Sequence, residues 1–358
     1  MLDSNQEKIR IPKILAPVKS LEGAERVIKA GADEIYCGVT IDELKEFVLY
    51  RGPDSEIPTY DELGKVVKYA HNHSVKTIVT VNNPFMLDMF EKPIRNHVRR
   101  CLDEGVDAFI VGDIGVISLI KSVDENVPLY ASTYMISTNS EAVEFLRKRG
   151  LNRVVLERQL TINELQEIVR RSKVDIEIFI HGGGCGFING SCYLYHFDFP
   201  SLNYAADMSE SLIKSPCAWD YKVSDLSQEK KELGYIPILD ALEFCSLCNL
   251  PELIKIGVAG FKLEGRDSCL WYQESTTKIY RELVNMLATG ELSSFKERIK
   301  SLKNGDFVPF PPTFLSVDDF CCQKRRCYYN SLLHAPYKVP LSWQTRTKSI
   351  FKTLVCTR

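Results

Sequence analysis

The stretch KILAPVKSLEGAERVIKAGADEIYCG, residues 13–38, decides the fold. Its two ends, KILAPV and EIYCG, are short apolar runs typical of buried strands. Between them, apolar residues recur at three- and four-residue steps until a glycine, which is the pattern of an amphipathic helix. The stretch therefore predicts a strand, a helix and a second strand.

The same unit recurs along the chain. Helical patterns such as YDELGKVVKYAHNH, SEAVEFLRKRG and INELQEIVRRSK separate the strand candidates, and the turns AGAD, EGVD and KIGVAG precede the second, fourth and eighth candidates. The strand candidates are Lys13–Val18, Glu34–Gly38, Lys76–Asn82, Ala108–Asp113, Pro128–Thr133, Arg153–Arg158, Ile176–Gly182 and Gly260–Arg266. Eight strands, each followed by a helix or its equivalent, predict an α/β fold, a TIM-like (β/α)8 barrel.

Polar residues stand where these strands end. In (β/α)8 barrels the chemistry gathers at the C-terminal ends of the strands. Those ends carry Cys37, Asn82, Asp113, Ser132, Thr133, Glu157, Arg158, His181, Glu264 and Arg266. Any single strand ends in polar residues by default, but a full ring of polar and ionisable ends predicts a functional site.

The connection after the seventh strand, residues 183–249, far exceeds the two to six residues usual for such loops. It carries five of the 12 cysteines, namely Cys185, Cys192, Cys217, Cys245 and Cys248. In a reducing compartment, thiols more often bind metals or catalyse reactions than form disulfides. Only Cys245 and Cys248 have the close spacing of zinc ligands, whereas an iron–sulfur cluster tolerates dispersed cysteines. The spacing therefore favours a cluster and leaves zinc, or no metal, as alternatives.

Several pieces of the chain resemble the peptidase U32 family, in the family's order and over residues 11 to about 285. They are ILAPVKSLEGAERVIKAGADEIYCG, AFIVGDIGV, PLYASTYMISTN, HGGGCGFINGSC, SPC and the final PELIKIGVAGFKLEGR, which Cys245 precedes at the family's spacing. The better understood members resemble oxygen-independent hydroxylation enzymes with a [4Fe–4S] cluster. The resemblance implies hydroxylation of RNA bases or a role in ubiquinone synthesis, with prephenate as the oxygen source in the RNA-modifying branches.

The resemblance also implies which thiols hold the cluster. Carried over position by position, the ligands are Cys185, Cys192, Cys217 and Cys245. Cys37 and Cys248 are alternates, because one lies at a strand end and the other lies close to Cys245 in sequence. Cys321, Cys322 and Cys327 form a further group, which fits either a second metal site or a packed tail.

Four other residues receive roles in such a site. The planar guanidinium groups of Arg158 and Arg266 suit a carboxylate-rich oxygen donor. His181 is expected to move protons near neutral pH, and Glu264 to orient a partner or act as a base. The structural alternatives are an ion pair between Glu264 and Arg266, and a histidine that merely pins the glycine-rich loop.

The chain divides into a barrel unit, residues 1–290, and a C-terminal extension of unknown role, residues 291–358. Residues 301–358 hold nine Lys/Arg and three Asp, a net charge of +6, so the first 300 residues carry −8 of the total of −2. Because the barrel is acidic, we favour a small molecule or a peptide as substrate. The basic tail supports the alternative, a tRNA or rRNA base hydroxylase.

The sequence also bears on the location of the protein and on two other functions, a protease and a non-catalytic subunit. The polar start lacks the apolar core of a signal peptide, and no apolar run approaches the roughly 20 residues of a membrane span, which predicts a cytoplasmic protein. A protease, as the family name says, is an alternative, although HExxH and GxSxG motifs are absent. A non-catalytic cluster-bearing subunit, paired with a related chain in a heteromer, is another.

Overall fold

The computed structural model describes residues 10–41, 43, 55–83, 86–183, 188–192, 221–225, 231–236, 243–303, 328 and 354–357. Eight parallel strands form a closed barrel, because each strand pairs with the next and the last pairs with the first. They are β1 (Lys13–Pro17), β2 (Glu34–Cys37), β3 (Lys76–Val81), β4 (Ala108–Val111), β5 (Leu129–Ala131), β6 (Arg153–Val155), β7 (Asp175–Gly183) and β11 (Gly260–Leu263). The predicted (β/α)8 barrel is confirmed.

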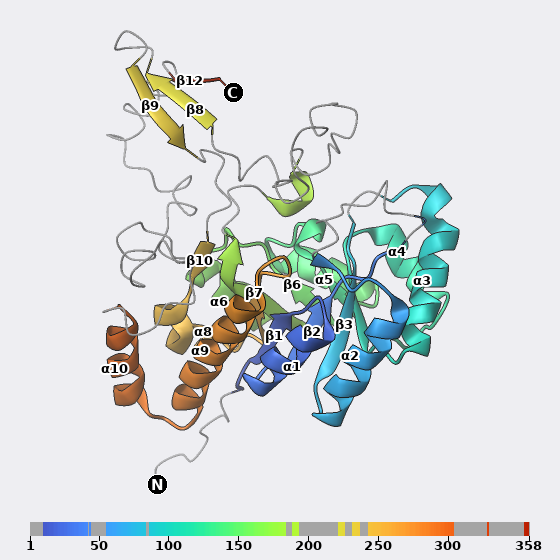
Figure 1. The fold of residues 1–358 in the computed structure, drawn as a ribbon, viewed down its shortest axis with the longest axis horizontal. Coiled ribbons are helices and arrows are strands. Elements are labelled where there is room, and N and C mark those ends of the chain that lie inside the picture. Colours follow the sequence, from blue (N-terminus) through green and yellow to red (C-terminus); the bar gives the residue numbers. More distant parts are fainter. Residues whose placement is uncertain are drawn as a thin grey trace.

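Helices follow the strands and surround the barrel (Figure 1). They are α1 (Leu21–Lys29), α2 (Tyr60–Asn72), α3 (Glu91–Asp103), α4 (Ile114–Lys121), α5 (Ser140–Lys148), α6 (Ile162–Arg171), α8 (Leu250–Ile256) and α9 (Leu270–Ala288). Side-chain caps fix where they begin: Ser20 accepts the N–H of Gly23, and Thr161 and Glu164 form a capping box.

Strand residues alternate between two apolar layers. The outward side chains pack with the helices in the main core, and the inward ones form a smaller cluster inside the barrel. Its members are Leu15, Tyr36, Ile78, Ala108, Ile110 and Tyr130. β5 is shorter than its predicted run because Ser132 leaves the strand to cap the 3-10 turn η3 (Thr133–Met135), accepting the N–H of Tyr134.

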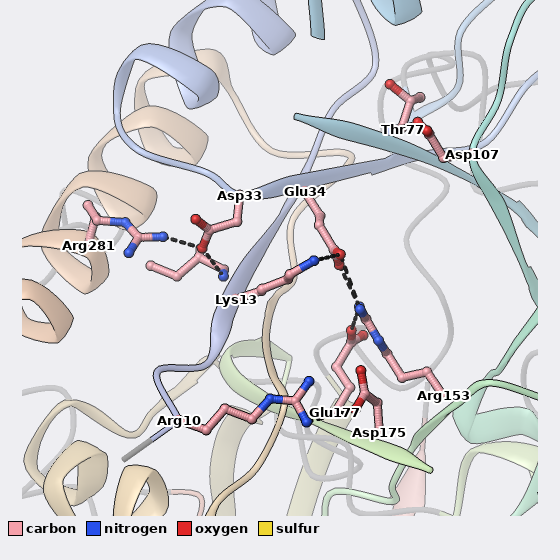
Figure 2. Close-up of polar contacts among 11 residues, drawn as sticks. Arg10, Lys13, Asp33, Glu34, Thr77, Asp107, Arg153, Asp175, Glu177 and Arg281 are labelled. Atoms are coloured by element: carbon pink, nitrogen blue, oxygen red, sulfur yellow. Dashed lines mark hydrogen bonds and ion pairs between the residues drawn. The ribbon is translucent and has the colours of Figure 1, made fainter. Parts of the chain in front are cut away.

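Ion pairs cross the barrel interior near the N-terminal ends of the strands (Figure 2). Arg153 of β6 bonds to Glu34 of β2 at 2.5 and 3.1 Å and to Glu177 of β7 at 2.9 Å. Lys13 reaches Glu34 at 3.1 Å. Burial raises the pKa of Glu34, but the hydrogen bond and charge of Arg153 outweigh burial and hold it below its usual value. This network ties four strands together through charge.

The long connection after β7 returns to the barrel through β10 (Glu243–Cys245), which pairs antiparallel with β7 and lies beside it in Figure 1. Two 3-10 turns flank this region, η4 (Asn189–Ser191) and η8 (Leu247–Asn249). The strands β8 (Tyr221–Asp225), β9 (Lys231–Ile236) and β12 (Leu354–Thr357) form a separate antiparallel sheet. α10 (Leu292–Lys303) follows α9, and η2 (Asp88–Phe90) precedes α3. None of the described helices has the length and apolar composition of a membrane span.

Candidate functional site

Two of the predicted site residues lie side by side at the C-terminal end of β7. The antiparallel pairing of β10 with β7 places Cys245 opposite His181 and Phe244 opposite Gly182. Cys245 is 1% exposed and His181 is fully buried. Gly182 has φ of +109°, and a Cβ there would lie 2.4 Å from the Cβ of Glu264, so the start of the glycine-rich loop requires glycine.

Cys192 is the second predicted ligand that the structure describes. It follows η4 directly and is 8% exposed. Asn189 fixes η4 to the strand ends: its side chain donates to Thr133 at 2.9 Å and accepts from Arg158 at 3.0 Å. Gly190 packs against η3 where a Cβ would lie 2.3 Å from the carbonyl oxygen of Tyr134. The loop that carries Cys192 is therefore held over β5 and β6.

The other cysteines of the predicted set fall outside the described residues. These are Cys185 and Cys217, together with the tail group Cys321, Cys322 and Cys327. Within the ranges that the structure describes, no three His, Cys, Asp or Glu side chains converge to hold a metal. The four-cysteine set thus stays a prediction, of which two buried, unbridged thiols at the C-terminal end of the barrel form the described half.

The two alternate ligands differ from these thiols. Cys37 is fully buried in the layer between the barrel and its helices, and burial raises its pKa to about 12. Cys248 lies in η8 and is exposed, three residues beyond Cys245. The structure therefore gives no support to Cys37 as a ligand and leaves Cys248 accessible near β10.

His181 contacts the hydroxyl of Tyr280 on α9, 3.2 Å from its Nδ1. That hydroxyl donates its single hydrogen to the carbonyl of Ile180 at 2.7 Å and accepts the N–H of Ser246 at 3.2 Å. His181 must therefore donate from Nδ1, which leaves Nε2 as the acceptor. Burial lowers the pKa of His181 to about 3, so the ring is neutral at pH 7. Its predicted proton transfer would start from the neutral ring, and its contacts also match the loop-pinning alternative.

Arg158 and Glu264 form an ion pair across the strand ends, 2.8 Å between Nη2 and Oε2. Glu264 thus pairs with Arg158 rather than with Arg266, the partner that the structural alternative named. The guanidinium of Arg158 also lies over the ring of Phe179, 3.9 Å from its centroid. Together with Asn189, which accepts from its Nη1, these groups orient Arg158 before any ligand arrives.

Arg266 is 8% exposed and points toward the second and third strands. Its Nη1 donates to the hydroxyl of Thr80 at 3.1 Å, and its guanidinium carbon lies 6.0 Å from the centroid of Tyr36. Thr80 in turn donates to the carbonyl of Cys37. The guanidinium has five N–H donors, and among the side chains that the structure describes only Thr80 accepts one of them.

Glu157, beside Arg158, is 3% exposed and accepts the backbone N–H of Asn189 at 3.4 Å. Burial raises its pKa to about 7, against the opposing charge of Arg158 and hydrogen bonds from backbone N–H groups. A carboxyl group that titrates near neutral pH can both accept and release a proton. Glu157 therefore joins the candidate proton-transfer groups.

Other members of the predicted ring have structural roles. Asp113 caps α4 by accepting the N–H groups of Gly115 and Val116. Asn82 donates to Ser132 at 3.2 Å, which links β3 to the end of β5. These contacts explain polar strand ends without any chemistry.

Sequence reasoning missed two residues that belong to this region. Lys262 lies inside the barrel on β11, and Tyr328 of the C-terminal extension is buried against Phe244 with ring centroids 5.6 Å apart. The two-residue alternation of Lys262, Glu264 and Arg266 along GFKLEGR was a signal for the lysine, because such residues share one face of a strand. Nothing local marked Tyr328.

Comparison with known proteins identifies relatives of the chain. A family model described as peptidase family U32 matches residues 19–315. An uncharacterized protease of Methanocaldococcus jannaschii is 30% identical over 313 residues, 82% of this chain and 71% of that protein. The tRNA hydroxylation protein P1 of Bacillus subtilis is 27% identical over 76% of this chain and 63% of its own length. A 23S rRNA 5-hydroxycytidine synthase of Escherichia coli is 28% identical over 77% and 39%.

Proposed function

The chain belongs to peptidase family U32, and we propose that it takes part in the hydroxylation of RNA bases. The observation that carries this proposal is the similarity to proteins named for tRNA and rRNA hydroxylation, in Bacillus subtilis and Escherichia coli. These relatives favour the RNA alternative over the small molecule or peptide that the acidic barrel suggested. The basic stretch 301–358, with its net charge of +6, agrees with an RNA partner.

The barrel end that carries the cysteines is the proposed reaction site. Cys192 and Cys245 are buried thiols there, and with Cys185 and Cys217 they would hold an iron–sulfur cluster. Such a group would supply electron transfer, or a Lewis acid if one iron were open. Zinc remains the alternative for the same thiols.

The chain's own residues would bind and orient the reactants. Arg158 and Arg266 present guanidinium groups at the strand ends, suited to an anionic oxygen donor. Glu157 would hold or release a proton at its carboxyl group, and neutral His181 would hold the start of the glycine-rich loop through Tyr280.

The rim around these groups suits an unpaired base. Exposed apolar side chains lie soon after the ends of β3, β4, β5 and β7, in the connections or at the first residue of α4, namely Met89, Ile114, Ile136 and Ile188. Trp271, 48% exposed, is the second residue of α9 and directly follows the β11 loop. Proteins that bind single-stranded RNA stack bases on exposed aromatic side chains, the part that Trp271 would play here. A heteromer with a related chain stays a prediction.

Nucleoside analysis tests the proposal. The chain would be expressed in a bacterial strain that lacks its own U32-family hydroxylation genes, and nucleosides from tRNA and rRNA would be separated by mass spectrometry. We expect a pyrimidine nucleoside heavier by one oxygen with wild-type protein and with Cys269→Ser, an exposed cysteine on α9, but not with Cys245→Ser. Identical nucleosides with and without the wild-type chain would refute RNA hydroxylation.

A further inference from the structure

Lys262 is a buried cation whose hydrogen-bonding capacity the described protein leaves unused. It points into the barrel from β11, and its side chain is 7% exposed. Its nearest carboxylate oxygen, Oε1 of Glu177, is 3.7 Å away, too far for a hydrogen bond. The other oxygen of Glu177 bonds to Arg153 at 2.9 Å. Among the described residues, no acceptor lies within hydrogen-bonding range of the Lys262 ammonium group.

Two aromatic rings link Lys262 to two further cations, Arg158 and Arg266. The Lys262 ammonium lies 4.4 Å from the centroid of Tyr36 and 5.5 Å from that of Phe179. Arg266 approaches the ring of Tyr36, and Arg158 covers the ring of Phe179. The three positive groups therefore share two rings at the C-terminal half of the barrel interior, near enough for Arg266 and Arg158 to act on the charge of Lys262.

The charges in this region interact with one another. The pKa of Lys262 is lowered to about 8. Burial is the main cause; the charges of Arg266 and Arg158 also lower the pKa, and those of Glu177 and Glu264 raise it. Arg158 is already paired with Glu264, but among the described residues no carboxylate is hydrogen-bonded to Lys262 or Arg266, and buried cations are costly unless an anion compensates them. The ammonium has three N–H donors, and Arg266 uses one of its five for Thr80. An oxyanion would accept hydrogen bonds from the remaining donors of Lys262 and Arg266 and would compensate their positive charges.

We propose that Lys262, Arg158 and Arg266 form an oxyanion-binding site in the mouth of the barrel. The oxyanion is a carboxylate of a small organic acid or a phosphate of the RNA, and the same three donors serve either source. Lys262 is the part of this site that the sequence did not reveal. The binding site rests on the geometry of the barrel and not on the proposed hydroxylation, so each is tested without the other.

The alternative is that Lys262 only balances the charge of Glu177. Replacing it would then change stability but not anion binding. Lys262→Met keeps the length of the side chain and removes the charge, and Lys262→Gln is a second variant should the first fold poorly. Lys13→Met is the matched control, because Lys13 contacts Glu34 of the interior ion-pair network from the N-terminal end of the barrel.

Calorimetric titration of the full chain with malonate, inorganic phosphate and uridine monophosphate tests the site. We expect wild type and Lys13→Met to bind at least one probe at one site per chain, and the Lys262 variants to bind it at least tenfold more weakly. Saturation by malonate alone identifies a small acid, and saturation by the two phosphate probes identifies RNA phosphate.

The pH dependence gives an independent readout. Because the pKa of Lys262 is about 8, the ammonium loses its charge as the pH rises through that value. Wild-type affinity should therefore fall between pH 7 and pH 9, whereas the affinity of Lys262→Met should not. Equal binding by wild type and folded Lys262 variants, or no saturable binding of any probe, would overturn the proposal.

Discussion

The backbone N–H of Tyr328 donates a hydrogen bond to the carbonyl oxygen of Cys245, 3.3 Å away. The hydroxyl of Tyr328 reaches the carbonyl oxygens of Gly182 and Gly183 at 3.2 and 3.1 Å. One residue of the C-terminal extension is therefore bound to both strands that position the candidate metal ligand. Through Tyr328, the extension helps to hold β10 against β7 at the candidate site.

Tyr328→Phe should loosen this strand pair. It keeps the ring against Phe244 and removes the hydroxyl, which leaves two buried carbonyl groups with one donor fewer. We expect a loss of about 1–2 kcal/mol in the free energy of unfolding, together with faster reaction of Cys245 with a thiol reagent, followed by mass spectrometry. Tyr69→Phe, whose ring lies on the half-buried face of α2 against His73, is the control. Unchanged Cys245 reactivity would show that Tyr328 does not position β10.

Arg153→Met should strongly destabilise the barrel. It removes the cation that Glu34 and Glu177 share and leaves them only Lys13 and, at 3.7 Å, Lys262, and breaking a buried pair in this way costs about 3–5 kcal/mol. Arg10→Met breaks the exposed pair with Asp175 and should cost at most about 1 kcal/mol. Urea unfolding of both variants measures the difference, and equal midpoints would contradict the assigned importance of the interior network.

Glu157→Gln should raise stability at alkaline pH. The folded-state pKa of about 7 exceeds the ordinary value of 4.5, so this group favours folding most below pH 4.5 and loses that contribution as the pH rises through 7. The variant mimics the protonated form at every pH. It should match wild type at pH 4.5 and be more stable at pH 8.5 by roughly 3 kcal/mol at most. Urea midpoints at both pH values, with exposed Glu252→Gln as control, check the sign; a variant less stable at pH 8.5 would reverse it.

Trp271→Ala should weaken the proposed RNA interaction. Stacking of a base on an aromatic ring contributes about 1–3 kcal/mol, so affinity for single-stranded RNA should fall at least about fivefold. Phe145→Ala on α5 is matched in exposure, 44% against 48%, but lies on the helical wall rather than in the rim. Filter binding at fixed salt measures both, and an equal loss in the two variants would assign the effect to something other than stacking.

The sequence predicted the barrel because its signals are local. Each strand and helix carries its own apolar period, and every strand candidate overlaps an observed strand. Arg158, Glu264 and Arg266 were found for the same reason, because the end of each apolar run in the sequence marks the end of a strand. The partner of Glu264 was not, because the choice between Arg158 and Arg266 depends on side-chain geometry across β6 and β11.

The residues that the sequence missed depend on contacts between distant segments. Whether Lys262 is a surface cation or an interior one depends on Tyr36 and Phe179, which come from two other strands. Cys37 was expected as an alternate ligand because its strand ends at the mouth, but the two-residue alternation turns its thiol into the helix-facing layer. The docking of Tyr328 on β10 joins residues 83 positions apart, and no periodicity encodes such a contact.

The proposed reaction site depends on buried thiols that hold an iron–sulfur group. The most direct measurement is iron, acid-labile sulfide and visible absorption of the full chain purified without air, for wild type, Cys245→Ser and the control Cys269→Ser. We expect brown wild-type and control proteins with about four iron and four sulfide per chain, and loss of colour and iron in Cys245→Ser. Colourless wild-type protein that holds zinc, or that takes up no iron on anaerobic reconstitution, would contradict it.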